Sequence, residues 1–222
     1  MNYERNTKYF ARISYAGAVW MFIVGVFLFI LSFTTVSVLM AFVFLSIALG
    51  ILIIVLKNKG KVSDEEYDSS VAANIDNFKQ RALDKLGLDE DEVNEIEPIY
   101  FDGFELEGFK HFKVGKDNCW RTDVVKAVIL FFSKDEVHCY TNKFCTTENR
   151  SVEATDVYFY KDIVSVSTAS NNKTVQGTSV DYESFRLTTA GGTNLTVVIR
   201  DKGSAQRSIN AMRSLLRSKK QG

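Results

Sequence analysis

The sequence predicts a membrane-anchored α+β protein: a two-helix transmembrane hairpin, a linker helix, and an antiparallel β-barrel or sandwich with a C-terminal helix. Three observations predict this fold class. Residues 13–56 hold two apolar runs without a charged side chain, and residues 63–87 repeat apolar side chains at helical spacing. Residues 98–200 contain several short stretches with the sequence pattern of β-strands, separated by turn residues.

The two apolar runs cover residues 13–33 and 36–56, and only Thr34 and Thr35 separate them. A bilayer core of about 30 Å is crossed by about 20 helical residues, so each run is long enough to span it once. The short connection predicts an antiparallel hairpin. Small residues predict close packing of its helices, namely Gly17, Gly25, Ser46 and Gly50. The absence of charge inside the runs favours an anchor over a pump or an ion pathway.

Basic residues flank both ends of this pair, whereas the turn between the runs is uncharged. They are Arg5, Lys8 and Arg12 before it and Lys57, Lys59 and Lys61 after it. The positive-inside rule therefore places residues 1–12 and the C-terminal part in the cytoplasm of a multi-pass inner-membrane protein. A cleaved signal peptide is disfavoured, because the first run is too long and leads directly into the second.

An amphipathic linker helix is predicted over residues 63–87. Ser63 and Glu66 have the spacing of a capping box, and Gly87 is a typical helix end. One apolar stripe runs along the helix, formed by Tyr67, Val71, Ile75, Phe78, Ala82 and Leu86. Because the opposite face carries both signs of charge, we expect the stripe to pack on a neighbouring domain.

Strands follow Pro98, the single proline of the chain. They are predicted at residues 99–104, 111–114, 122–132, 137–144, 155–160 continuing into 163–168, 182–189 and 194–200. Turns are predicted at residues 133–135, 170–173 and 190–192. A final amphipathic helix is predicted at residues 204–217.

Residues 98–219 resemble the pleckstrin-homology-like (PH-like) domains of bacterial membrane-anchored proteins. The resemblance rests on Tyr158-Phe159-Tyr160-Lys161-Asp162-Ile163-Val164-Ser165-Val166, on Phe185-Arg186-Leu187, on Leu195-Thr196-Val197-Val198-Ile199 and on the final helix. It implies a barrel plugged by that helix and a module that binds lipids or proteins without chemistry of its own. It also implies a headgroup site near the first strands, where Lys110, Lys113, Lys116 and Arg121 fall.

Charge is balanced overall but unevenly spread. The 27 basic and 27 acidic residues give no net charge, which argues against general nucleic-acid binding. Nine acidic and no basic residues lie between Asp89 and Glu107, whereas residues 200–220 are mostly basic. The basic end predicts contact with anionic headgroups of the inner leaflet through Arg213, Arg217, Lys219 and Lys220. Two solvated faces explain the pattern equally well.

No metal or cofactor is expected. Cys119, Cys139 and Cys145 form no CxxC pair, and the two histidines, His111 and His138, lack the spacing of metal ligands or of a Cys-His catalytic pair.

The sequence therefore predicts a non-enzymatic, membrane-anchored cytoplasmic binding or adaptor protein that recognises a protein or a lipid surface. The alternative is an accessory subunit of a membrane transporter or envelope assembly. An enzyme is a third reading, which the lack of a phosphate-binding loop and of a Ser/His/Asp set disfavours. The oligomeric state is left open.

Overall fold

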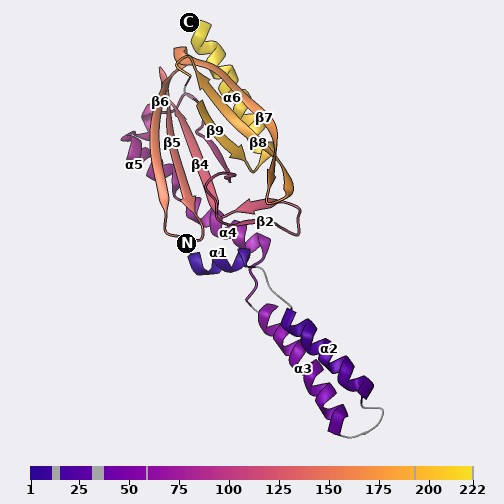
Figure 1. Ribbon diagram of the computed structural model, residues 1–222. Helices are drawn as coiled ribbons and strands as arrows, with labels where there is room; N and C mark the ends of the chain where they lie inside the picture. Colours follow the sequence, from indigo (N-terminus) through magenta and orange to yellow (C-terminus); the bar gives the residue numbers. More distant parts are fainter. Residues whose placement is uncertain (12–15, 32–37, 59, 193, 222) are drawn as a thin grey trace. The chain divides into compact units, whose positions relative to one another are not determined.

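The structure, a computed structural model, describes residues 1–11, 16–31, 38–58, 60–192 and 194–221 (Figure 1). These residues divide into two compact units. Arg5–Ser63 make up the first, here named the helical unit, and Met1–Glu4 with Asp64–Gly222 make up the second, named the β unit.

The N-terminal helices are α1 (Tyr3–Phe10), α2 (Ala16–Leu31) and α3 (Val38–Asn58). In the helical unit α2 lies beside α3 (Figure 1). Small residues line this contact as expected, since a Cβ on Gly25 would meet Ser46, although one on Gly17 would meet nothing within 4 Å. Large apolar side chains are exposed on both helices, among them Trp20 at 67% and Leu45 at 64%. Surfaces of this kind commonly mark contacts with other molecules.

The predicted transmembrane hairpin is wrong. Among the described residues no helix is both long and apolar enough to cross a bilayer. Because it depends on the hairpin, the predicted multi-pass location in the inner membrane, with both termini cytoplasmic, is wrong as well. The ends of the first span, the turn at Thr34 and Thr35 and the start of the second lie outside the described residues.

Two helices replace the predicted linker helix over residues 63–87. They are α4 (Asp64–Ile75) and α5 (Phe78–Leu86), and the chain departs from helical geometry at Asn77, with φ −99° and ψ 25°. Gly87 ends α5 in the left-handed region at φ 67°, and its backbone N–H donates to the Leu83 carbonyl. This end agrees with the sequence pattern. A short 3₁₀ helix, η2 (Glu90–Glu92), follows.

In the described part of the β unit, three antiparallel sheets are formed. The first has the order β1-β4-β5-β6, with bounds Ile99–Phe104, Val124–Phe132, Glu136–Cys145 and Ser151–Phe159. The second pairs β2 with β3, with bounds Phe112–Val114 and Trp120–Thr122. The third has the order β7-β8-β9, with bounds Ile163–Val175, Thr178–Thr189 and Asn194–Ile199. The 3₁₀ helix η3 (Tyr160–Asp162) joins β6 to β7.

The main core lies between the first and third sheets, and α6 (Lys202–Gln221) packs against it (Figure 1). Ile209 and Met212 of α6 are fully buried there. Phe101 of β1 stacks on Phe185 of β8 with ring centroids 4.4 Å apart. The described fold is therefore α+β with three antiparallel sheets, which corrects the predicted fold class.

A second cluster covers the outer face of the first sheet. Phe78, Ala82 and Leu83 of α5 pack on Ile129 and Phe131 of β4. The predicted apolar stripe thus does pack on the neighbouring sheet. Because α4 and α5 lie over this face, the outward side chains of β1 lie beneath the point where α4 ends and α5 begins.

Two details of the strands differ from the predictions. The single strand over residues 122–132 is split at Asp123, whose buried carboxylate accepts the backbone N–H of Lys110 and of His111 at 2.9 and 3.1 Å. The turn predicted at residues 170–173 lies inside β7, and the chain turns instead at Gln176 and Gly177, with φ 48° and 82°.

Candidate functional site

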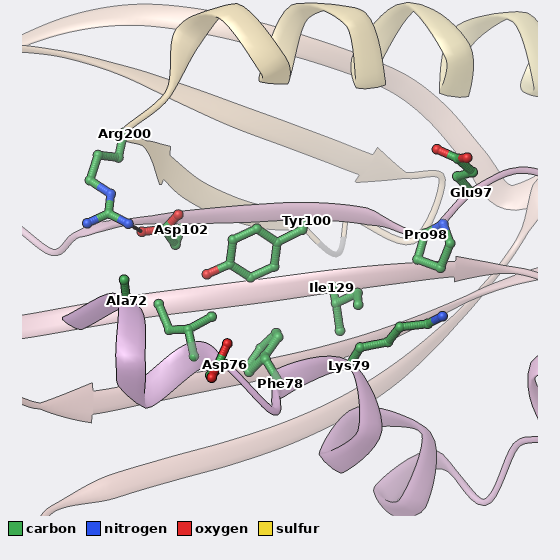
Figure 2. A pocket seen from close by; sticks show the side chains of 11 residues that line it. Ala72, Asp76, Phe78, Lys79, Glu97, Pro98, Tyr100, Asp102, Ile129 and Arg200 are labelled. Atoms are coloured by element: carbon green, nitrogen blue, oxygen red, sulfur yellow. Dashed lines mark ion pairs between the residues drawn. The ribbon is translucent and has the colours of Figure 1, made fainter. Parts of the chain in front are cut away.

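A groove lies between the α4–α5 helices and β1, and we name it the α4–β1 groove (Figure 2). Its volume is about 650 Å³, within the range of ligand sites in proteins. It is lined by Ala72, Ile75, Asp76, Phe78, Lys79, Glu97, Pro98, Tyr100, Asp102, Ile129 and Arg200. All of these residues belong to the β unit.

The floor of the groove is apolar. Ile75 and Phe78 come from the two sides of the break between α4 and α5, while Tyr100 and Ile129 lie opposite each other on the paired strands β1 and β4. The rings of Phe78 and Tyr100 meet edge to face with centroids 5.6 Å apart. This contact leaves the side of Tyr100 that faces the groove available, and Tyr100 is 36% exposed. The floor can therefore accept aliphatic or aromatic groups.

One end of the groove holds an ion pair. Asp102 Oδ2 lies 2.7 Å from Arg200 Nη2, and the Arg200 backbone N–H donates to the Asp102 carbonyl at 3.0 Å (Figure 2). Among the described residues, no donor is oriented to make a hydrogen bond to Asp102 Oδ2. The attraction between Asp102 and Arg200 is therefore mainly electrostatic. Burial raises the pKa of Asp102 despite the opposing effect of Arg200. Burial, together with the nearby Asp102, also raises the pKa of Tyr100 well above its usual range.

The other end is bordered by the acidic stretch of the sequence. Glu97 lines the groove there, and Lys79 forms an ion pair with Glu90 of η2 at 2.7 Å. Both cations of the lining, Lys79 and Arg200, are thus engaged by carboxylates, while Asp76 and Glu97 add two further negative charges. Carboxylates therefore outnumber cations in the lining by three to two.

The predicted headgroup residues near the first strands do not converge on an open site. Arg121 is 4% exposed and bonds to Asp68 and Asp117. Lys110 forms an ion pair with Glu148, and Lys113 lies in β2 opposite Arg121. Lys116 is exposed, and its backbone N–H donates to Asp64 at 2.7 Å.

The predicted basic residues of α6 mostly bond within the β unit. Arg213 Nε donates to the Val166 carbonyl at 3.0 Å, and Lys220 Nζ to the Ile163 carbonyl at 2.6 Å. Lys219 lies 3.0 Å from Glu95 and donates to the Lys134 carbonyl, while Arg217 is exposed. Figure 1 shows the end of α6 and β2 at opposite ends of the β unit, so the two predicted sets do not form one surface.

The cysteines do not come together either. Cys119 is exposed, whereas Cys139 and Cys145 are buried, and all three are free thiols. Burial raises the pKa of Cys139 to about 12, so this thiol stays protonated at neutral pH. In the described ranges no cluster of three or more metal-ligating side chains occurs.

Sequence reasoning missed the groove. Ile75 and Phe78 were predicted as packing residues, and Asp102 was part of the acidic stretch, but nothing joined them to Tyr100 or Arg200. The usable signal was the coincidence of the acidic stretch with Pro98 and the start of a strand. This coincidence indicates that charged residues border an apolar strand, but it does not indicate which element packs opposite that strand.

The fold and the groove define this chain as an α+β protein with a groove on the outer face of its first sheet that has an apolar floor and a carboxylate-rich rim. No family model matches the chain, and no curated protein or solved structure is significantly similar to it. The resemblance to PH-like domains therefore stays a prediction.

Proposed function

We propose that this chain is a non-enzymatic binding protein that recognises an apolar, positively charged segment of a protein partner in the α4–β1 groove. The observation that carries the proposal is the combination of an apolar floor with a negative rim. A floor formed by Ile75, Phe78 and Tyr100 favours aliphatic or aromatic side chains, and the carboxylates at both ends favour Lys or Arg beside them.

The charges favour a protein partner over an anionic lipid. A phosphorylated headgroup needs cations that are free to receive it, whereas Lys79 and Arg200 are each held by a carboxylate within 2.7 Å. Asp76 and Glu97 would repel such a headgroup further. A basic peptide meets the opposite situation, because each of these carboxylates can accept bonds from it.

The state of the polar groups supports binding rather than catalysis. Tyr100 and Asp102 are the groove residues with raised pKa values, and burial is the main cause for both. A tyrosine with so high a pKa cannot act as a base near neutral pH, and the ion pair with Arg200 occupies Asp102. Tyr100 and Asp102 also bond to each other, so neither is placed to act as a general base.

The proposal is tested by selecting peptides from a random displayed library against the full chain. We expect the selected peptides to combine apolar residues with Lys or Arg. Ala72→Trp, which fills the groove from α4, should weaken their binding by about tenfold or more. Ala73→Trp makes the same change on a neighbouring exposed residue outside the lining and should leave binding within about twofold.

Two results would overturn the proposal. One is a selected set without enrichment of basic residues. The other is equal binding by the two tryptophan variants, which would place the recognised surface elsewhere.

A further inference from the structure

In the described residues, the edges of β1 and β9 and the first part of the edge of β7 are covered. The close approach of Gly103 to Val198 brings β1 against β9, and the Arg200 backbone N–H donates to Asp102 beside it. At its N-terminal end the edge of β7 is covered by α6, because Arg213 and Lys220 donate to the Val166 and Ile163 carbonyls. Covered edges of this kind prevent unwanted strand pairing.

The edge of β6 is different. In the described part of the chain β6 pairs with β5 alone, over the continuous register from Phe144↔Ser151 to Glu136↔Phe159. No hydrogen bond from another strand or from α6 reaches it in that part of the structure. Figure 1 shows β6 as the outermost strand of the first sheet.

The backbone groups that face outward from β6 follow from its register. The Cys145 N–H donates to the Arg150 carbonyl at 2.8 Å before the strand, and the Tyr160 N–H donates to the Asp135 carbonyl at 3.3 Å after it. Bonded pairs alternate along an antiparallel ladder, so the even-numbered residues of β6 bond to β5. The N–H and C=O groups of residues 151, 153, 155, 157 and 159 therefore point away from the sheet.

The side chains along this edge are apolar and acidic. Val152, Val157 and Phe159 are 65%, 47% and 49% exposed, which is unusual for a strand of a packed sheet. Glu153 and Asp156 are acidic. The Glu153 carboxylate accepts a bond from the Tyr140 hydroxyl at 2.8 Å and lies 3.1 Å from Lys85 Nζ, whereas Asp156 is exposed on the opposite face of the strand. A strand laid beside β6 would therefore find apolar and negative side chains opposite its own.

We propose that the β6 edge binds an extended, alternately apolar and basic segment of a protein partner, which adds a fifth strand to the four-stranded first sheet. The outward N–H and C=O groups supply the ladder bonds. Val157 and Phe159 receive the segment's apolar side chains on one face of the sheet, and Asp156 receives a basic side chain on the other face. A second copy fits poorly, because antiparallel pairing about Thr155 would place Glu153 opposite Val157 and Asp156 opposite Ala154, so that the Asp156 carboxylate would find no basic side chain.

The probe is a labelled synthetic peptide that alternates valine and lysine, titrated with the full chain at low salt. Thr155→Pro removes one outward N–H and places a ring on the edge, a change that edge strands tolerate. It should weaken binding by about tenfold or more. Thr155→Ala keeps the N–H and should bind within about twofold of the wild type. Ala72→Trp should also bind normally, which separates this edge from the groove.

Amide exchange locates the contact. Bound peptide should slow exchange at Glu153, Thr155 and Val157, and N-methylation of alternate peptide residues should abolish both binding and protection. Equal binding by Thr155→Pro and Thr155→Ala would overturn the proposal, as would equal binding of a valine–glutamate peptide. Dimerisation through β6 that the valine–lysine peptide does not reverse would also overturn it and assign the edge to a second copy.

Discussion

Arg121 joins α4 to the β2–β3 pair through two carboxylates. Its guanidinium bonds to both oxygens of Asp68, at 2.8 and 2.7 Å, and to both oxygens of Asp117, at 3.0 and 2.6 Å. It is 4% exposed, whereas the carboxylate side chains are 34% and 43% exposed. Planar bidentate pairing of this kind is specific to arginine.

Arg121→Met should lower the free energy of unfolding by about 2–3 kcal/mol, because two carboxylates lose their partner while water still reaches them partly. Urea denaturation of the full chain measures the change. Arg121→Lys is the matched control and should lose less, since it keeps the charge. Unchanged stability in Arg121→Met would contradict this role.

The same cluster predicts a dependence on pH. The bonds from Arg121 hold the pKa of Asp117 well below its ordinary value of 3.8. A lowered pKa stabilises the folded state above the ordinary value, and this contribution is lost as the pH falls below it. The unfolding midpoint of the wild type should therefore fall more steeply between about pH 5 and about pH 3 than that of Asp117→Asn. Parallel curves for the two proteins would refute the assignment.

At the level of single residues, the sequence indicated which side chains are charged but not where they point. Arg121 was predicted as a headgroup contact, yet its side chain is 4% exposed and bonds to Asp68 of α4 and to Asp117. Tyr67, by contrast, was correctly assigned to the packed stripe, because helical spacing alone determines its face. Periodicity therefore predicts burial better than it predicts ionic partners.

Among the elements, β1 and β9 depend on a single glycine. A Cβ on Gly103 would overlap the Val198 carbonyl, which belongs to the backbone and cannot rotate away. Gly103→Ala should therefore destabilise the β unit by about 1–3 kcal/mol. Gly191→Ala is the matched control, since its nearest atom would be 3.9 Å away. Equal unfolding midpoints for the two variants would show that the close approach of β1 to β9 contributes nothing to the stability of the β unit.

Local patterns predicted some elements and failed where a distant contact decides. The β8–β9 hairpin around Gly191 and the end of α5 at Gly87 follow from glycine placement and alternation. The turn predicted at residues 170–173 was wrong because Asn171 and Asn172 bond across the hairpin, to Ser184 and to Asp181. A run of polar residues resembles a turn in the sequence of one strand, because the sequence does not show that these residues bond to the neighbouring strand.

For the whole molecule, the largest error concerned residues 13–56. Counting apolar residues predicted two spans of adequate length, whereas no helix among the described residues is both long and apolar enough to cross a bilayer. The groove was unpredictable for a different reason. Its lining comes from α4, α5, β1, β4 and Arg200, which follows β9, so no local window of sequence contains it.

The central claim is that the α4–β1 groove recognises an apolar and basic segment. Methyl NMR of the full chain, titrated with a library-selected peptide, tests it most directly. We expect the methyl signals of Ile75 and Ile129 to shift in the wild type and in Ala73→Trp, and to stay unchanged in Ala72→Trp. Shifts confined to residues outside the groove, or shifts at Ile75 and Ile129 that Ala72→Trp leaves intact, would contradict the claim.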